Sequence, residues 1–183
     1  MICIDGLRDV KVCGELTHEK VAEFEAQRKE LEAASEAAKN ISNTLNHLLA
    51  NYQIFYMNTR GFHWNITGAS FFELHAKFEE LYNDSLIKID EIAERILTLG
   101  ETPLHTYADF LEIATINASK HITDGKAAIK DILNAYSILL PLERTILDNA
   151  AEANDEGTAA LMSDYIREQE KLVWMFTAYL KNS

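Results

Sequence analysis

Cysteine, proline and glycine are scarce in this sequence of 183 residues. The two cysteines, Cys3 and Cys13, are too few for a disulfide framework, and we expect them to be free thiols. The chain has only two prolines and seven glycines, whereas 48% of its residues are hydrophobic. This composition favours an all-α protein, and the length is sufficient for a domain with its own core.

Basic charge and long apolar runs are also lacking. The chain has 17 Lys and Arg residues against 29 Asp and Glu residues, which gives a net charge of -12. This excess of acid disfavours a general surface for nucleic acids or anionic membranes, and it favours the attraction of cations. No apolar run approaches the roughly 20 residues of a membrane span, and the chain does not start like a signal peptide. We therefore expect a soluble, cytoplasmic protein, and surface exposure stays open.

Residues 1–40 are expected to form an N-terminal extension to a domain that spans residues 41–183. Thr17 is a candidate N-cap for a helix from about His18 to Lys39, whose few bulky apolar residues can bury only a thin stripe. The extension contains six basic and nine acidic residues, so it is not a cationic arm for DNA phosphates. We expect it to be a partly helical appendage.

Apolar residues at helical spacing predict four long helices in the domain. These helices cover residues 40–65, 70–100, 123–153 and 158–181. Thr106 predicts the start of a short capped helix in the connection after residue 100, and Pro141 is expected to kink or break the third long helix. Two helical hairpins joined by a long crossover are typical of a ferritin-like four-helix bundle.

The helix over residues 70–100 carries a stripe of potential metal ligands. Ser70 and Glu73 predict a capping box at its start, and Gly100 marks its end. The polar residues of the stripe lie at about 0°, 40°, 60° and 100° around the helix axis; they are His75, Glu79, Asp90 and Glu94. Glu79 and Asp90 are separated by about 16 Å along the axis, so one straight helix cannot bring both pairs to one ion.

A second copy of this helix could complete the site. An antiparallel copy across a two-fold axis near Ser85 would place the Asp90 and Glu94 pair opposite the His75 and Glu79 pair of its neighbour. This geometry predicts two equivalent metal sites per dimer. The alternative is that the carboxylates form an ordinary acidic surface and that the histidine is a satisfied structural residue.

His63 adds a further potential ligand. It ends the preceding long helix, and the short connection between the two helices should place it close to His75. A mixture of imidazole and carboxylate ligands suits iron, zinc or manganese. Open coordination positions favour redox-active iron over a structural zinc site.

Several motifs strongly resemble the signature of the Dps family, the DNA-binding proteins from starved cells, also called mini-ferritins. They are HWN at residues 63–65, LH at 74–75 with an acid four positions after the His, DEIAERILTLG at 90–100 and EKLVWM at 170–175. The resemblance runs from about Asn43 to Leu180, so only the extension falls outside it.

The resemblance implies an iron-oxidising enzyme that also stores iron. Members of this family oxidise Fe²⁺, preferably with hydrogen peroxide, at ferroxidase sites on two-fold interfaces, and they keep ferric mineral in a hollow dodecamer, which protects against oxidative damage. The implied ligands are His63, His75 and Glu79 from one subunit and Asp90 and Glu94 from the other. Glu79 stands where many relatives have Asp. Iron is the implied metal, with zinc as an alternative occupant.

The resemblance also implies roles outside the ligand set. Trp64 resembles an electron-donating tryptophan of the family, although simple packing explains it equally well. Iron is expected to enter through acidic pores at three-fold axes, because a narrow opening lined by carboxylates concentrates cations. Glu156 matches one pore position by its distance from Trp174, and Asp155 and Asp164 are candidate substitutes at another.

Two other classes of function stay open. One is a structural or surface assembly, such as an adhesin, an antigen or a pilus-like component, and the unusual N-terminal extension is the argument for it. The other is a DNA-compacting protein. The acidic extension and the lone Lys181 near the C-terminal end disfavour DNA binding.

Overall fold

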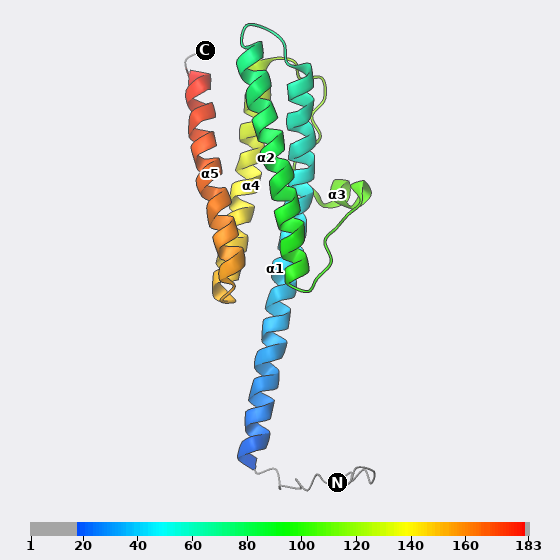
Figure 1. Cartoon of the computed structure of the whole chain (residues 1–183), viewed down its shortest axis with the longest axis vertical. Coiled ribbons are helices and arrows are strands. Elements are labelled where there is room, and N and C mark those ends of the chain that lie inside the picture. Colours follow the sequence, from blue (N-terminus) through cyan, green and yellow to red (C-terminus); the bar gives the residue numbers. More distant parts are fainter. Residues whose placement is uncertain (1–17, 182–183) are drawn as a thin grey trace. The chain divides into compact units, whose positions relative to one another are not determined.

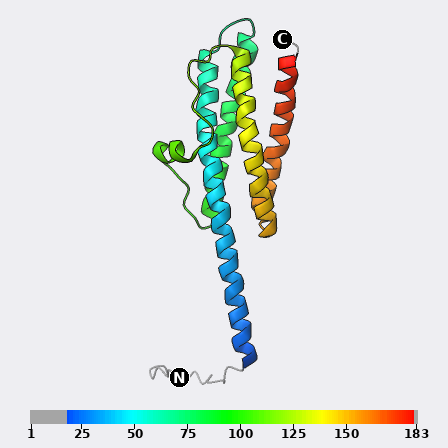
Figure 2. The ribbon, with the colours of Figure 1, turned by 180° about the vertical axis from the view of Figure 1, so that it is seen from behind.

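The computed structural model describes residues 18–181, with side chains from residue 20 onward. This range contains five helices and no strand. They are α1 (His18–Asn65), α2 (Phe71–Thr98), α3 (Tyr107–Ile113), α4 (Gly125–Glu152) and α5 (Glu156–Lys181). Four long helices run side by side, and the short α3 lies on the flank away from α5 (Figures 1 and 2). The predicted all-α bundle with a short helix in its crossover is confirmed.

The chain divides into two compact units, residues 1–35 and residues 36–183. In the first unit, the described side chains of α1 are all exposed, including the apolar Phe24 and Leu31. The proposed cap at Thr17 and the cysteines Cys3 and Cys13 lie outside the described residues. The expected domain boundary after residue 40 stays a prediction.

The two helices predicted on either side of residue 40 are one helix. α1 runs for 48 residues without interruption. Its sequence has neither glycine nor proline before Gly61. Nothing therefore interrupts the backbone hydrogen-bond ladder where a boundary was expected.

Side-chain caps fix the starts of three helices but not of α2. The Thr106 hydroxyl accepts a hydrogen bond from the Asp109 backbone N–H (3.2 Å), as predicted. Asp124 accepts from the Ala127 N–H (2.8 Å) and Asp155 from the Thr158 N–H (3.0 Å). The predicted capping box at Ser70 is wrong. Its backbone (φ -98°, ψ 28°) departs from the extended conformation that an N-cap requires, and its side chain makes no capping bond.

Pro141 does not break α4. The helix continues through it to Glu152, and the Pro141 side chain is exposed. The Pro141 carbonyl accepts a hydrogen bond from the Thr145 hydroxyl (3.0 Å). Only one ladder bond is lost, because proline lacks the N–H that would reach the Ser137 carbonyl.

Apolar side chains of all four long helices fill the bundle. The core residues whose side chains have no measurable exposure include Leu45, Leu48, Phe78, Ile92, Ile129, Leu139, Ile146 and Met162. Each long helix thus buries one stripe against its neighbours. Within the described range, no helix is both long and apolar enough to cross a membrane.

A carboxylate lies among these apolar side chains. Glu143 on α4 is fully buried, and its Oε1 accepts hydrogen bonds from the Tyr52 hydroxyl (2.9 Å) and from Gln169 Nε2 (2.5 Å). Burial raises the pKa of Glu143 to about 7, although these hydrogen bonds and the Lys88 ammonium act to lower it. Glu143 Oε2 and Gln169 Oε1 have no hydrogen-bond partner among the described residues.

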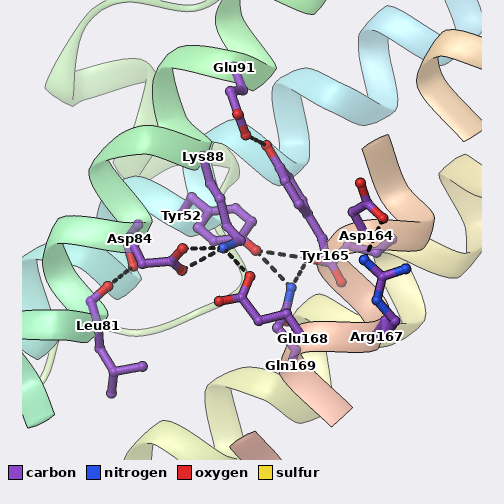
Figure 3. Close-up of polar contacts among 12 residues, drawn as sticks. Tyr52, Leu81, Asp84, Lys88, Glu91, Asp164, Tyr165, Arg167, Glu168 and Gln169 are labelled. Atoms are coloured by element: carbon purple, nitrogen blue, oxygen red, sulfur yellow. Dashed lines mark hydrogen bonds and ion pairs between the residues drawn. The ribbon is translucent and has the colours of Figure 1, made fainter. Parts of the chain in front are cut away.

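An ion-pair network centred on Lys88 joins α2 and α5 (Figure 3). The buried Lys88 ammonium donates to Asp84 (2.5 Å) and to Glu168 (2.8 Å), and it lies 5.1 Å from the centre of the Tyr165 ring. We call the seven residues of both groups the interior polar cluster; they are Tyr52, Asp84, Lys88, Glu143, Tyr165, Glu168 and Gln169. All four long helices contribute to it.

Substituting Gly125 by alanine should destabilise the bundle. An added Cβ would collide with Leu74 Cδ1 and lie 3.6 Å from Ile66 Cδ1, and Leu74 is buried. We expect Gly125→Ala to lower the free energy of unfolding by about 1–3 kcal/mol in urea titrations. Gly61→Ala is the control, because a Cβ there meets nothing within 4 Å. The control should be neutral or stabilise by up to about 1 kcal/mol, and equal losses in both variants would contradict the packing argument.

Titration of Glu143 should make stability depend on pH. Its pKa rises from 4.5 to about 7 on folding, so the unfolded chain loses the proton first as the pH increases. The contribution of Glu143 to the free energy of unfolding is therefore greatest at acidic pH. It falls by at most about 3 kcal/mol as the pH rises from 4.5 to 7.

Urea unfolding of wild type and Glu143→Gln at a series of pH values isolates this effect. Glutamine does not titrate. The free energy of unfolding of Glu143→Gln minus that of wild type should therefore increase as the pH rises from 4.5 to 7. Glu152→Gln, an exposed carboxylate on the same helix, should follow the wild-type curve. A difference between wild type and Glu143→Gln that is independent of pH would show that Glu143 does not titrate in this window.

Candidate metal centre

His63 and His75 hold each other at the end of the first helical hairpin. His63 lies in the last turn of α1, and His75 lies near the start of α2. The His63 Nδ1 bonds to the His75 carbonyl oxygen (2.8 Å), and the His75 Nδ1 bonds to the His63 carbonyl oxygen (2.9 Å). Their rings stack with centroids 3.8 Å apart. The predicted proximity of the two histidines is confirmed.

These two bonds select one tautomer of each imidazole. A carbonyl oxygen can only accept, so each Nδ1 must carry the hydrogen. In the neutral ring, the lone pair is then on Nε2. Histidine ligands of metals usually donate their other ring N–H to a carbonyl or carboxylate in this way, which fixes the ring and increases its basicity as a ligand. Both histidines therefore have the tautomer that suits metal binding through Nε2.

Aromatic neighbours further restrict the two rings. The Tyr82 ring packs edge-on against His63, with centroids 5.3 Å apart. Phe71 stacks on His75 at 5.0 Å. Both histidines are half-buried, so each imidazole is oriented by packing and hydrogen bonding while part of its surface stays accessible.

The acidic residues of the predicted site divide into two groups. Glu79 lies one turn after His75 on α2 and is exposed, so the two residues share one face of the helix. Asp90 and Glu94 are also exposed on α2. Asp90 lies about 16 Å from Glu79 along the helix axis. Among the described residues of one chain, no group of three or more His, Cys, Asp or Glu side chains could hold a metal ion. The fold of one chain therefore brings His63 and His75 together but not the two acidic groups.

Trp64 projects from the same end of α1 and is 56% exposed. The Arg60 guanidinium lies 4.8 Å from the centre of its ring and donates to the Tyr56 hydroxyl (2.8 Å). This exposure excludes Trp64 from the core of a single subunit.

The three candidate pore residues differ in their surroundings. Asp155 accepts hydrogen bonds from Thr158 and from Arg95 (2.6 Å). Its partial burial favours the neutral acid, but the Thr158 and Arg95 bonds outweigh burial and lower the pKa of Asp155. Glu156 is exposed, and the exposed Asp164 pairs with Arg167 (2.9 Å).

The interior polar cluster was missed in the sequence. A signal for it was present, because Glu143 falls between Leu139 and Ile146 on the apolar stripe of α4. Lys88 likewise falls between Leu81 and Ile92 on the stripe of α2. Ionisable residues at core-facing positions are rare unless they are paired. Each of these two residues therefore indicates that another polar side chain lies beside it in the core.

Comparison with known proteins agrees with this architecture. Residues 42–183 match the family model described as ferritin-like domain. The solved structure of a Dps protein from Vibrio cholerae O1, described as a ferritin-like diiron-carboxylate protein, is 56% identical to this chain. The match covers 80% of this chain and 92% of that one with a TM-score of 0.79.

Two further relatives carry the same assignment. A DNA protection during starvation protein from Porphyromonas gingivalis is 44% identical over 135 residues, which cover 74% of this chain and 85% of the relative. A zinc-soaked Dps structure from Listeria innocua is 27% identical and covers 78% of this chain and 97% of that one, with a TM-score of 0.75. The family match and these identities show that this chain belongs to the Dps group of ferritin-like proteins.

Proposed function

We propose that this protein oxidises Fe²⁺ at sites shared by two subunits and stores the ferric product inside a hollow homo-oligomer. The observation that carries this proposal is the reciprocal bonding of His63 and His75, which leaves Nε2 of each ring available to a metal one turn from Glu79. By family resemblance, the oligomer is a cytoplasmic dodecamer that protects against oxidative damage.

A two-fold axis across α2 would complete each site. The separation of about 16 Å between Glu79 and Asp90 prevents them from binding the same ion within one chain. An antiparallel second copy would bring Asp90 and Glu94 to the histidines and Glu79 of its neighbour. Each pair of subunits would then share two equivalent sites.

The ligand set suits Fe²⁺ as a substrate. Two imidazoles and three carboxylates provide nitrogen and oxygen ligands without a closed tetrahedral sulfur site. With hydrogen peroxide as the oxidant, two Fe²⁺ ions each lose one electron, and one peroxide with two protons becomes two waters. This two-electron reduction releases no hydroxyl radical. Zn²⁺ would compete for the same ligands but cannot be oxidised.

Residues around the site have supporting roles in this proposal. Trp64, exposed beside His63, would supply an electron when a stray oxidant forms. Glu156 and Asp164 would line the acidic entry for iron, as their exposure permits, whereas the Asp155 carboxylate is engaged by Arg95 and Thr158. The net charge of -12 disfavours DNA compaction.

Loss of the two histidines should abolish rapid iron oxidation. We expect His63→Ala/His75→Ala to oxidise Fe²⁺ with stoichiometric hydrogen peroxide at least about tenfold more slowly, because each site loses both nitrogen ligands. Stopped-flow absorbance of the ferric product measures the rate, and light scattering checks the assembly. The control is His105→Ala, which removes an exposed histidine from the crossover and should keep the wild-type rate. Equal rates in all three assembled proteins would exclude this site.

Mixing two inactive variants tests whether the site is shared. His63→Ala/His75→Ala subunits and Asp90→Ala/Glu94→Ala subunits should each be inactive alone. A mixed dimer would contain one site with all its ligands. Its other site would lack all four substituted ligands, the two histidines and the two acids. After unfolding and random co-assembly, about a quarter of the sites should be intact, and about a quarter of the wild-type rate should return.

The mixture is compared with each variant taken separately through the same refolding. Recovered activity supports ligands from two subunits. If mixed assemblies form, as mass-tagged subunits would show, but remain inactive, the site does not combine these two groups of residues.

A further inference from the structure

Four large apolar side chains of α2 are exposed in a single chain. Phe72 is 81% exposed, Leu97 and Ile87 are each 59% exposed, and Leu86 is 52% exposed. Three of them lie within the stripe of proposed ligands, at about 60°, 40° and 20° around the helix axis from its first histidine; they are Phe72, Leu97 and Leu86. Exposed apolar residues that gather on one helix face indicate a contact surface for another molecule.

These apolar residues follow the same register as the proposed ligands. Phe72 lies three residues before His75 on α2, and Leu97 lies three residues after Glu94. In the antiparallel pairing that sets His75 opposite Glu94 of the partner subunit, Phe72 is therefore opposite Leu97 of the partner subunit. The ligands alone specify that pairing, so the apolar residues support it independently.

Other positions on the stripe fit the same pairing. Ala76 directly follows the histidine and Ala93 directly precedes the glutamate, so these two small side chains also face each other and allow a close approach of the helices. Leu86 falls opposite Asn83 of the partner subunit, close to the two-fold axis. Apolar side chains thus lie on both sides of each ligand group, one layer at the outer end and one near the axis.

Ring contacts connect Phe72 to the paired histidines. The Phe72 ring packs edge-on against Phe71, with centroids 5.3 Å apart. Phe71 in turn stacks on His75 at 5.0 Å, and His75 stacks on His63 at 3.8 Å. A side chain of a second subunit that covers Phe72 would therefore also restrict the ring that lies against His75.

We infer that Phe72 packs against Leu97 of the partner subunit and that this apolar pair closes the outer end of each shared metal site. The inference rests on the two-fold arrangement of the proposed function. Along the helix axis, the apolar pair lies about 4.5 Å beyond the level of His75 and of Glu94 from the partner subunit. An apolar wall so close to the ligands limits the access of water and strengthens their binding to a metal.

A disulfide between the two positions tests the packing. In a Cys3→Ser/Cys13→Ser background, diamide should convert most of the Phe72→Cys/Leu97→Cys protein to a covalent dimer on a denaturing gel without reductant. The two positions are about 37 Å apart along one α2, so they cannot form a disulfide within a chain. Phe72→Cys and Leu97→Cys alone are the controls. Each position lies about as far from its own copy across the axis, so both controls should run as monomers.

The cross-linking result decides the inference without iron. An assembled double variant that runs as a monomer overturns it, and so does equal cross-linking of the single variants. If the double variant does not assemble, the two single variants are refolded together, and covalent dimers should form only in that mixture. Mixed assemblies without covalent dimers overturn the inference as well. Covalent dimers in a protein that does not oxidise Fe²⁺ would support this packing and contradict the proposed function.

Zn²⁺ binding tests the closure of the site. Calorimetry measures the Zn²⁺ binding that wild type has and His63→Ala/His75→Ala lacks. Phe72→Ser should weaken this binding at least about tenfold because water reaches the outer end of the site, whereas Phe72→Leu should retain it. Unchanged binding in Phe72→Ser, or an equal loss in Phe72→Leu, contradicts the closure. If wild type has no histidine-dependent Zn²⁺ binding, the proposed site fails and the closure fails with it, while cross-linking still decides the packing.

Discussion

The rigid rise of an α-helix is the constraint on which the proposed iron site depends. α2 presents His75 and Glu79 near its start and Asp90 and Glu94 much later, on one stripe. At about 1.5 Å per residue, no rotation of side chains can join the two groups within a chain. A protein with this stripe either leaves both halves incomplete or completes them across an interface. Chemistry at such a site is thereby tied to assembly.

Within the subunit, the two histidines are fixed before any metal binds. Their Nδ1 atoms bond to each other's backbone carbonyls, so the orientation of each ring is set by the hairpin between α1 and α2. Preorganisation of this kind lowers the cost of ordering ligands when a metal arrives. Glu79 is exposed, and no other residue of the described range bonds to its carboxylate, which suits a ligand that adjusts to the metal and to the second subunit.

The bundle interior follows a different rule. Glu143, Lys88 and their partners are buried among apolar side chains, where each charge is costly unless it is paired or neutralised. Lys88 is paired with Asp84 and Glu168, while the raised pKa of Glu143 makes its neutral form accessible near neutral pH. The subunit therefore separates two cation environments, an accessible one on α2 and an enclosed one that already contains an ammonium.

The sequence by itself determined the helical bundle, its short crossover helix and the proximity of His63 to His75. Periodic apolar residues and the Thr106 cap are local signals, and a short connection allows only an antiparallel hairpin. The contacts of the interior polar cluster were decided only by the tertiary structure. Glu143 contacts residues 91 and 26 positions away, so its environment depends on how four helices pack. Ser70 failed as a cap because it lies in a turn, closed by a hydrogen bond from the Phe71 N–H to the Gly68 carbonyl (3.2 Å), in which its backbone is not extended.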